Sequence, residues 1–348
     1  MNTFFIIAIV VLVFLVIFQI AKVSEYVSVL KGEEQSRKQQ NKINGFLMIA
    51  FLILGLIGVW WCNDMLYHKT LFSYGAASAE GKSIDKMMWI TIILTGIVFF
   101  ITQILLFWFA FRYQESDKRK PLYFTHSNKL EIIWTAVPAI TLTVLVVFGL
   151  KYWFKFTGDA PKNAQVIEIT GHQFAWEFRY PGRDGILGRK NFKLIDPAKG
   201  NPLGVDWSDA ASHDDIHVAT TVHVVVNRPV KFVINSMDVI HDVGLPAFRL
   251  KMDAVPGTPT TEWFTPIYTT EEMKKRTGNP DFTYEIACDQ LCGIGHFSMR
   301  GVIIVETQKE FNAWMIKQRP EYLKAKQFLV NASADSIKTV ALGNRSGQ

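Results

Sequence analysis

The residues best suited to chemistry lie in one short segment near the end of the chain. Cys288, Cys292, His296 and Met299 fall within twelve residues, and a second histidine, His241, lies upstream of them. Thiolate and thioether sulfurs combined with imidazole nitrogens are soft ligands that suit copper. The set of two Cys, two His and one Met therefore predicts a copper site.

The residues alone leave other uses of these side chains open. The two cysteines could form a disulfide, which would leave His296 and Met299 without a role. A Cys2His2 zinc site would not use the methionine, a mononuclear copper site normally takes one Cys, and covalent haem needs a Cys-x-x-Cys-His spacing that is absent here. Two copper ions sharing both thiolates would use the whole set. Bridging sulfur would spread one electron over both metals and keep the structural change on electron transfer small.

Four apolar segments in the first half of the chain must set the position of this cluster relative to a membrane. They cover residues 4–20, 43–62, 87–111 and 132–150. Each is about 17 to 25 residues long, which is enough to cross a hydrocarbon core as a helix. Buried core helices are the alternative, but such helices are rarely apolar on every face. No basic residue precedes the first segment, so a cleaved signal peptide is not expected.

The charges of the connecting loops predict the orientation of these helices. The loops after the first and third segments each carry five Lys and Arg, whereas the loop after the second carries three. Because basic residues favour the cytoplasmic side, the first and third loops are expected inside. The N-terminus and all residues beyond about 151 are then expected on the outer face of the membrane.

The overall composition excludes several classes of protein. The chain has 348 residues, of which 49% are hydrophobic, and a formal net charge of +6. Plentiful aliphatic and aromatic residues exclude a disordered chain, and three cysteines are too few for a disulfide-rich module. The first and third loops each contribute +2 to the charge. Most of the surplus therefore sets membrane topology, and nucleic-acid binding is not expected.

The outer part of the chain has the pattern of an all-β domain. Short runs rich in Val, Ile, Thr and aromatic residues are separated by turn signals, which predicts a β-sandwich or barrel. The predicted strands cover residues 166–170, 174–180, 217–226, 230–235, 282–287 and 301–306. Residues 182–215 are rich in Gly, Asp, Asn and Lys and predict a long surface excursion. A capping box at Thr307–Glu310 predicts a final helix, followed by a polar tail.

At this point the chain resembles subunit II of haem–copper cytochrome c oxidases, over roughly residues 87–306. The resemblance rests on the Cys-x3-Cys-x3-His-x2-Met spacing with its upstream His, on residues 130–138 and on residues 171–178. It implies a transmembrane helical hairpin followed by a cupredoxin-like Greek-key sandwich, which carries a binuclear CuA copper centre.

The resemblance also implies a role for each candidate ligand. Cys288 and Cys292 would bridge the two copper ions, while His241 and His296 would each bind one of them. The weak ligands would be Met299 on one copper and the backbone carbonyl of Gln290 on the other. The family usually has Glu at the position of Gln290, and that carboxylate binds a nearby magnesium ion. Gln is a neutral and poorer ligand, which puts magnesium binding here in doubt.

Three further residues match positions with roles in the family. Glu131 matches a Glu at the cytoplasmic mouth of a proton path into subunit I, although a Glu is also favourable at any helix N-terminus. Phe174 stands where the family often has the Trp at which electrons arrive from cytochrome c, and Trp176 is retained nearby. Both are candidate electron-entry residues, with core packing as the alternative for Trp176. Asp214, Asp215, Asp238 and Asp242 are expected to form an acidic patch that faces a basic cytochrome.

The resemblance implies a subunit of a respiratory oxidase in the bacterial inner membrane, with the N-terminus and the copper domain in the periplasm. The electron donor would be a c-type cytochrome, or a haem-c domain of a quinol-oxidising complex within a supercomplex. Electrons would pass to haem in subunit I, where oxygen is reduced to water with proton translocation. Subunits I and III are the implied partners.

Three rival functions remain. A quinol oxidase subunit II would lack the copper ligands, and the CuA domain of nitrous oxide reductase would lack the hairpin with Glu131. A copper-binding electron-transfer or assembly protein outside an oxidase stays open.

The predicted domains are two extra N-terminal transmembrane helices (1–62), the hairpin (63–150), the copper domain (151–306), and a C-terminal helix with a polar tail (307–348).

Overall fold

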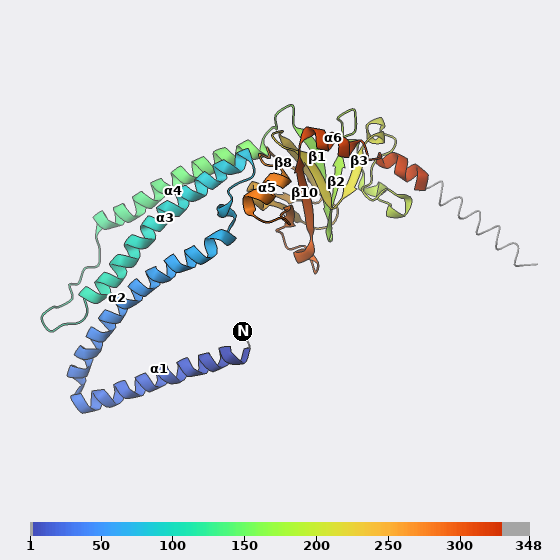
Figure 1. The fold of residues 1–348 in the computed structure, drawn as a ribbon. Helices are drawn as coiled ribbons and strands as arrows, with labels where there is room; N and C mark the ends of the chain where they lie inside the picture. Colours follow the sequence, from blue (N-terminus) through green and yellow to red (C-terminus); the bar gives the residue numbers. More distant parts are fainter. Residues whose placement is uncertain (1–2, 329–348) are drawn as a thin grey trace, which may run out of the picture. The chain divides into compact units, whose positions relative to one another are not determined.

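The computed structural model describes residues 3–328. The chain forms two compact units, which are described separately below (Figure 1). The first unit contains the residues up to 68 together with residues 90–139. The second contains residues 69–89 together with those from 140 onward.

Four long helices account for the apolar half of the chain. They are α1 (Thr3–Lys31), α2 (Glu33–Leu66), α3 (Ala79–Arg112) and α4 (Asn128–Thr157). All four are long and apolar enough to cross a membrane. Most of their large hydrophobic side chains are exposed, which is the pattern expected for helices whose solvent is lipid. The four predicted membrane-spanning helices are therefore confirmed.

In the first unit, α2 packs through aromatic pairs against the C-terminal half of α3, the half that is predicted to lie towards the cytoplasm. The rings of Phe46 and Phe111 lie 5.2 Å apart, and those of Phe51 and Phe107 lie 5.6 Å apart. At the end of α3, Glu115 lies 3.5 Å from Arg37, and Lys38 forms an ion pair with Asp117. The turn between α1 and α2 thus lies beside the loop between α3 and α4. The two most basic loops are therefore at the same end of the helices.

The second unit is a sandwich of two five-stranded sheets. In one sheet the order is β3-β2-β1-β5-β8, and in the other it is β4-β10-β9-β6-β7. The strands are β1 (Gln165–His172), β2 (Ala175–Tyr180), β3 (Ile216–Ala219), β4 (Thr221–Val225), β5 (Val230–Ser236), β6 (His241–Leu245), β7 (Leu250–Ala254), β8 (Thr260–Phe264), β9 (Tyr284–Cys288) and β10 (Arg300–Glu306). Strands β1 and β5 are parallel, as are β4 and β10, and the other pairs are antiparallel. The predicted cupredoxin-like Greek-key sandwich is confirmed.

Alternating side chains build the core between the sheets. In β5, Val230, Phe232 and Ile234 are fully buried while the residues between them are partly exposed, as expected when successive side chains point to opposite faces. Phe248 packs against Phe264 and Tyr284 at 4.7 and 4.6 Å between ring centroids. This aromatic core provides a rigid base for the loops at its ends.

The predicted single strand over residues 217–226 is wrong in one respect. Thr220 adopts a left-handed conformation with φ of 67°, and the chain crosses there from one sheet to the other. Its N–H donates to the carbonyl of Trp176 at 3.0 Å, and its carbonyl accepts from Val302 at 2.8 Å. The run therefore forms two strands, β3 and β4, because Thr220 joins the two sheets. Strands β6, β7 and β8 and the helix α5 (Thr270–Thr277) were not predicted.

The segment before α3 is bound to the sandwich. The backbone of Ala77 donates to the carbonyl of Ala247 at 2.8 Å and accepts from Ile267 at 2.9 Å. Arg249 donates to Asp85 at 2.7 Å. These contacts attach the N-terminal end of α3 to the β-sheet domain, and they occupy Arg249.

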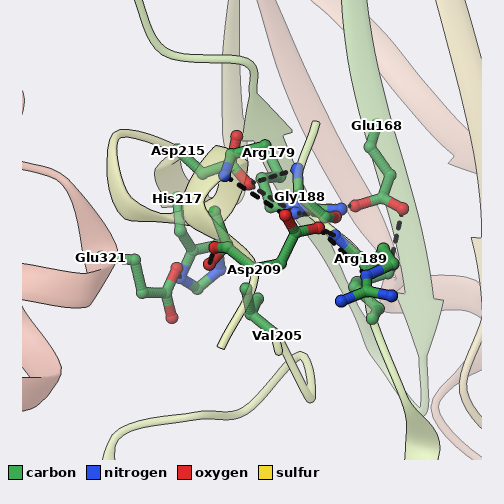
Figure 2. Close-up of polar contacts among 12 residues, drawn as sticks. Glu168, Arg179, Gly188, Arg189, Val205, Asp209, Asp215, His217 and Glu321 are labelled. Carbon is green, nitrogen blue, oxygen red and sulfur yellow. Dashed lines mark hydrogen bonds and ion pairs between the residues drawn. The ribbon is translucent and has the colours of Figure 1, made fainter. Parts of the chain in front are cut away.

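The predicted surface excursion between β2 and β3 is held down by a buried ion network. Arg179 donates to Glu168 and to Asp215, both at 2.6 Å, and Lys190 lies 2.9 Å from Glu168. Figure 2 shows Arg179 between the two carboxylates. Because Asp215 is buried in this network, it cannot belong to the predicted acidic surface patch.

The chain beyond the sandwich returns to the same region. The capping box at Thr307 opens α6 (Gln308–Met315) as predicted. Residues 321–328 are again helical, and Glu321 lies 2.9 Å from His217 on β3. The predicted polar tail lies largely beyond residue 328, outside the described part of the chain.

Candidate metal centre

The predicted ligand loop spans the gap between two neighbouring strands. Cys288 is the last residue of β9, and Met299 directly precedes β10. The N–H of Cys288 donates to the carbonyl of Met299 at 3.2 Å, which closes the neck of the loop. A single turn of 3-10 helix at His296–Ser298 lets the chain reverse within this short span. The strand ladder thereby brings residues at both ends of the loop side by side.

The loop brings its sulfur and nitrogen atoms together. The sulfurs of Cys288 and Cys292 lie 3.8 Å apart. Cys292 Sγ lies 3.6 Å from His296 Nδ1 and 3.9 Å from Met299 Sδ, and Cys288 Sγ lies 3.2 Å from the carbonyl oxygen of Gln290. The four side chains and the one backbone carbonyl predicted from the loop thus converge on one small volume.

His241 reaches this volume from a different strand. It begins β6, which pairs with β9 through Val243 opposite Cys288. Its Nδ1 lies 3.8 Å from Cys288 Sγ, and the imidazole is fully buried. His241, Cys288 and Cys292 offer ligand atoms that all lie within 4.8 Å of one another. The pairing of β6 with β9 therefore brings the upstream His241 to the Cys loop.

A second set of contacts orients His241. Its Nε2 lies 2.8 Å from a carboxylate oxygen of Asp238, and the other oxygen of Asp238 accepts from the N–H of Gln173 at 2.7 Å. The side chain of Gln173 in turn donates to the carbonyl of Cys292 at 2.6 Å. Asp238 and Gln173 therefore connect both ligand-bearing segments. Sequence reasoning did not assign them this role, although Asp238 stands only three residues before His241.

The donor set fits a copper site. Two thiols, two imidazole nitrogens, a thioether and a carbonyl are the ligands of a soft, redox-active metal. Burial raises the pKa of the Cys292 thiol to about 11, and the neighbouring Cys288 adds to this rise. A cation in the site is therefore needed to hold the sulfurs as thiolates near neutral pH. Both cysteines are free, so the disulfide alternative is not formed in this structure.

The doubt about magnesium rests on the residue at position 290 and stays a prediction. The side chain at position 290 is an exposed amide, which has no charge with which to bind a hard cation. Among the described residues, His241, Cys288 and Cys292 form the one group of three metal-binding side chains with ligand atoms this close together.

Phe174 and Trp176 lie against the site in different ways. Phe174 is partly buried, and its ring lies so close to Gly293 and Gly295 that a Cβ at either glycine would be within about 3 Å of it. Trp176 is fully buried, with its ring 6.0 Å from that of His241 in an edge-on arrangement. Trp176 therefore contacts a candidate ligand but is too buried to contact a partner. Phe174 packs against the ligand loop and is partly exposed.

The ligand loop itself presents an apolar surface. Leu291, Ile294 and Phe297 are 79%, 93% and 82% exposed. Val239 and Ile240, which precede His241, are also exposed. Isolated exposed hydrophobics are ordinary, but several on the two segments that carry the metal ligands make a candidate interaction site. We call these five residues the apolar rim.

Two of the four residues of the predicted acidic patch are buried, whereas Asp238 is exposed and Asp214 is partly exposed. Asp242 is buried, and burial together with the neighbouring Asp253 raises the pKa of Asp242 to about 7. Asp215 is buried against Arg179, and Asp238 is committed to His241 and Gln173. The sequence could not show this, because Asp215 and Asp242 are buried by strand pairing that brings them against Arg179 and Asp253.

Glu131 lies in the first turn of α4, in the helical unit. Its side chain is exposed, and its N–H donates to the carbonyl of Ser127 at 2.9 Å. Within residues 3–328 no ion pair to its carboxylate is found. Its position at a helix N-terminus is as predicted, and its role stays a prediction.

Comparison with known proteins covers both units. The model of the cytochrome c oxidase subunit II periplasmic domain matches residues 165–307, and that of the subunit II transmembrane domain matches residues 66–152. The match thus begins earlier than the resemblance seen in the sequence. Residues before 66 lie outside both models.

Several relatives are similar over most of their length. The alternative cytochrome c oxidase subunit 2 of Bradyrhizobium diazoefficiens is 33% identical over 276 residues, which is 78% of this chain and 92% of that protein. Cytochrome c oxidase subunit 2 of Cereibacter sphaeroides is 30% identical over 239 residues, which is 66% of this chain and 74% of that protein.

Among solved structures, the periplasmic domain of subunit II of cytochrome oxidase of Bradyrhizobium japonicum is 28% identical, with a TM-score of 0.31. It covers 45% of this chain and 94% of that one. From the two family models and the Bradyrhizobium diazoefficiens relative, we conclude that this membrane protein belongs to the cytochrome c oxidase subunit II family.

Proposed function

We propose that this chain is the electron-entry subunit of a respiratory oxidase in a bacterial inner membrane. It accepts electrons one at a time from a c-type cytochrome, or a haem-c domain, on the periplasmic face. It delivers them to haem in subunit I, where oxygen is reduced to water with proton translocation. The observation that carries this proposal is the convergence of Cys288, Cys292, His296, Met299 and the Gln290 carbonyl with His241 from another strand.

The residues of the site would hold a binuclear copper centre. Cys288 and Cys292 would bridge the metals, and His241 and His296 would each bind one ion through Nδ1. Met299 and the carbonyl of Gln290 would complete the set as weak ligands. When bound, the copper pair would supply one-electron transfer with little structural change. Asp238 would keep the proton of His241 on Nε2, which leaves Nδ1 free to bind metal.

The apolar rim is the surface at which we expect the electron donor to dock. It lies on the same two loops that carry the ligands, so a donor bound there would be close to the metals. Loss of Asp215 and Asp242 from the predicted acidic patch supports an apolar contact over an electrostatic one. The candidate residues through which electrons enter are Phe174, which packs against the ligand loop, and Trp176, which packs against His241.

The orientation of the chain in the membrane follows from its loops. The two most basic loops lie at the same end of the helical unit, which supports a cytoplasmic position for that end. Glu131, exposed at the start of α4, would then lie on the cytoplasmic side, where it would take up protons for subunit I. Subunits I and III are the expected partners, together with the donor, which is either a c-type cytochrome or the haem-c domain of a quinol-oxidising complex in a supercomplex.

Each of the proposed domains has its own role in this proposal. Residues 1–62 would add two helices, 63–150 would form the hairpin beside subunit I, and 151–306 would carry the copper centre. Residues 307–348 would form a C-terminal helix and tail.

Copper content and electron paramagnetic resonance of the purified full-length chain test this proposal. We expect two copper ions per chain and a spectrum in which one unpaired electron is shared by two equivalent nuclei. Cys292→Ser should lose that spectrum, whereas Cys62→Ser, at the exposed cysteine of α2, should keep it. One copper per chain, or an intact spectrum in Cys292→Ser, would contradict the bridging arrangement. A copper-binding assembly protein would bind metal without oxidising reduced cytochrome c in the intact complex.

A further inference from the structure

Glu262 is a buried carboxyl group that the metal site does not use. It lies in the middle of β8 and is 2% exposed. Its buried Oε1 has no hydrogen-bond partner within the described residues. A buried polar group without a partner is costly, so its presence calls for an explanation.

The two cations that share the cavity with Glu262 already have other partners. Arg249 and Lys251 line the same cavity as Glu262. Arg249 donates to Asp85 at 2.7 Å, and Lys251 lies 2.8 Å from Asp289. Neither forms an ion pair with Glu262 in the described part of the chain, so no counter-charge stabilises its carboxylate.

The other charged groups around β8 do not supply one either. On β6, the carboxylate of Asp242 opposes ionisation of Glu262, and Asp242 stands opposite Asp253 of β7. On β5, Lys231 pairs across the sheet with Trp263 rather than with Glu262. From α4, the amine of Lys155 lies over the ring of Trp263 at 5.9 Å.

Glu262 lines a cavity that can hold water. Its volume is about 230 Å³, and apolar residues of α4 and β7 form much of its wall. A water molecule in the liquid occupies about 30 Å³, so the cavity has room for several. Water in this cavity would give Glu262 a partner with which to exchange a proton.

One residue of the cavity wall is connected to the metal ligands by strand pairing. Met252 lines the cavity and pairs with Val243 of β6, which in turn pairs with Cys288 of β9. Two strand spacings correspond to about 10 Å. This is the separation of Met252 from Cys288. Asp242, which directly follows His241 in β6, links the metal site to Glu262, because its carboxylate acts on Glu262 through a low-dielectric interior.

We propose that Glu262 is a proton-exchange site coupled to the electron occupancy of the metal site, an inference that rests on the proposed function. When the site gains one electron, the carboxylate of Glu262 takes up one proton from water in the cavity and becomes a neutral acid. When the electron leaves, the O–H bond breaks and the proton returns to that water. The balance is one electron and one proton in each direction.

The pKa of Glu262 lies in the range in which a change of charge at the metal site can change its protonation. Burial raises its pKa to about 8, and the carboxylate of Asp242 adds to the rise. Below this range Glu262 is neutral in both electron states, so coupling is absent. Above it, Glu262 is charged in the oxidised state and opposes the arriving electron, so the reduction potential should fall as pH rises.

The test is the pH dependence of the metal site's reduction potential in the copper-loaded full-length chain. The wild-type potential should fall above pH 8, by at most about 59 mV per tenfold change in proton concentration. Glu262→Gln, which has nearly the same shape, should remove this slope. Glu285→Gln should retain it, because Glu285 is a solvent-accessible carboxylate on β9, the strand of Cys288. Redox-difference infrared spectra at pH 8 should show a carboxylic-acid band that Glu262→Gln loses.

Two results would overturn the inference. The first is a wild-type potential independent of pH from 6 to 9.5, and the second is an unchanged slope in Glu262→Gln. Either result would leave a binuclear copper spectrum intact, whereas failure of the proposed function would appear as absence of that spectrum.

Discussion

One carboxylate oxygen of Asp238 lies 2.8 Å from Nε2 of the buried imidazole of His241. The second oxygen accepts a hydrogen bond from the backbone of Gln173, whose side chain donates to the carbonyl of Cys292. Hydrogen bonds from Gln173 and His241 outweigh partial burial and lower the pKa of Asp238. An ionised Asp238 thus fixes the ring of His241 and links it to the loop that carries the sulfur ligands.

Asp238→Ala should therefore weaken metal binding without removing a ligand. Losing such a carboxylate partner of a metal-binding histidine typically costs roughly 10- to 100-fold in affinity. Asp238→Asn, which keeps an acceptor for the Nε2 proton, should recover part of that loss. Chelator competition with copper on the full-length chain measures the affinity, and Asp281→Ala, an exposed position away from the loop, is the control. Equal affinity in Asp238→Ala and wild type would show that Asp238 has no orienting role.

Ile294→Ser tests whether the apolar rim binds the electron donor. Burying a side chain of this size contributes about 1.5 to 3 kcal/mol, so its loss should raise KM for reduced cytochrome c roughly tenfold or more while the copper spectrum stays unchanged. Because the contact is apolar, the ratio of KM values should persist at high ionic strength. Ile186→Ser, at an exposed position on the excursion after β2, should leave KM unchanged. If Ile294→Ser impaired assembly of the oxidase and left KM unchanged, the apolar rim would bind subunit I and not the electron donor.

The sequence contained enough to place most of the metal site. Cys288, Cys292, His296 and Met299 are close in the chain, so a single loop must bring them together. The long apolar runs predicted four helices because few other structures tolerate such sequences. Local patterns of this kind need no knowledge of the tertiary fold.

The contacts that the sequence did not reveal are those between distant segments. Thr220 has ordinary strand composition around it, and only its position between two sheets explains its left-handed conformation. Asp215 is buried because Arg179, on another strand, meets it. Glu262 lies in a strand, β8, that the sequence did not predict. In each case the deciding partner is set by sheet order, which composition does not encode.

Glu131→Gln should slow proton uptake in the intact oxidase. Removing a group that transfers protons typically reduces the rate by a factor of roughly 100 or more, whereas electron entry through the copper site should keep its rate. Proton uptake on reduction of the oxidase in vesicles measures this effect. Glu115→Gln, at the same end of the helices and 3.5 Å from Arg37 in the wild type, is the matched control. Unchanged uptake in Glu131→Gln would leave Glu131 as a helix-terminal carboxylate only.

The buried contacts of His217 should make the stability of the sandwich depend on pH. Its two ring nitrogens lie 2.7 Å from Glu177 and 2.9 Å from Glu321. Burial alone would lower the pKa of His217, but these two carboxylates outweigh it and raise the pKa to about 9. For Glu177, burial opposes ionisation, yet His172 and His217 together lower its pKa to about 2.

The signs of these two shifts define a window of maximum stability. A raised histidine pKa stabilises the fold fully below the unfolded value of 6.5, and this contribution is lost as pH rises through 9. A lowered Glu177 pKa stabilises the fold above 4.5, and this is lost as pH falls through 2. The contact is therefore strongest between pH 4.5 and 6.5.

We accordingly expect the thermal unfolding midpoint of the sandwich, measured in the full-length chain, to fall between pH 6 and pH 9.5. The loss of free energy attributable to His217 should be roughly 2 to 3 kcal/mol. His217→Gln should lower the midpoint at pH 6 and flatten this dependence, because Glu177 and Glu321 are then left without their shared cation. His126→Gln, at an exposed loop position, should retain the wild-type profile. If His217→Gln also retained it, the attachment of residues 321–328 to β3 would rest on contacts other than this ion pair.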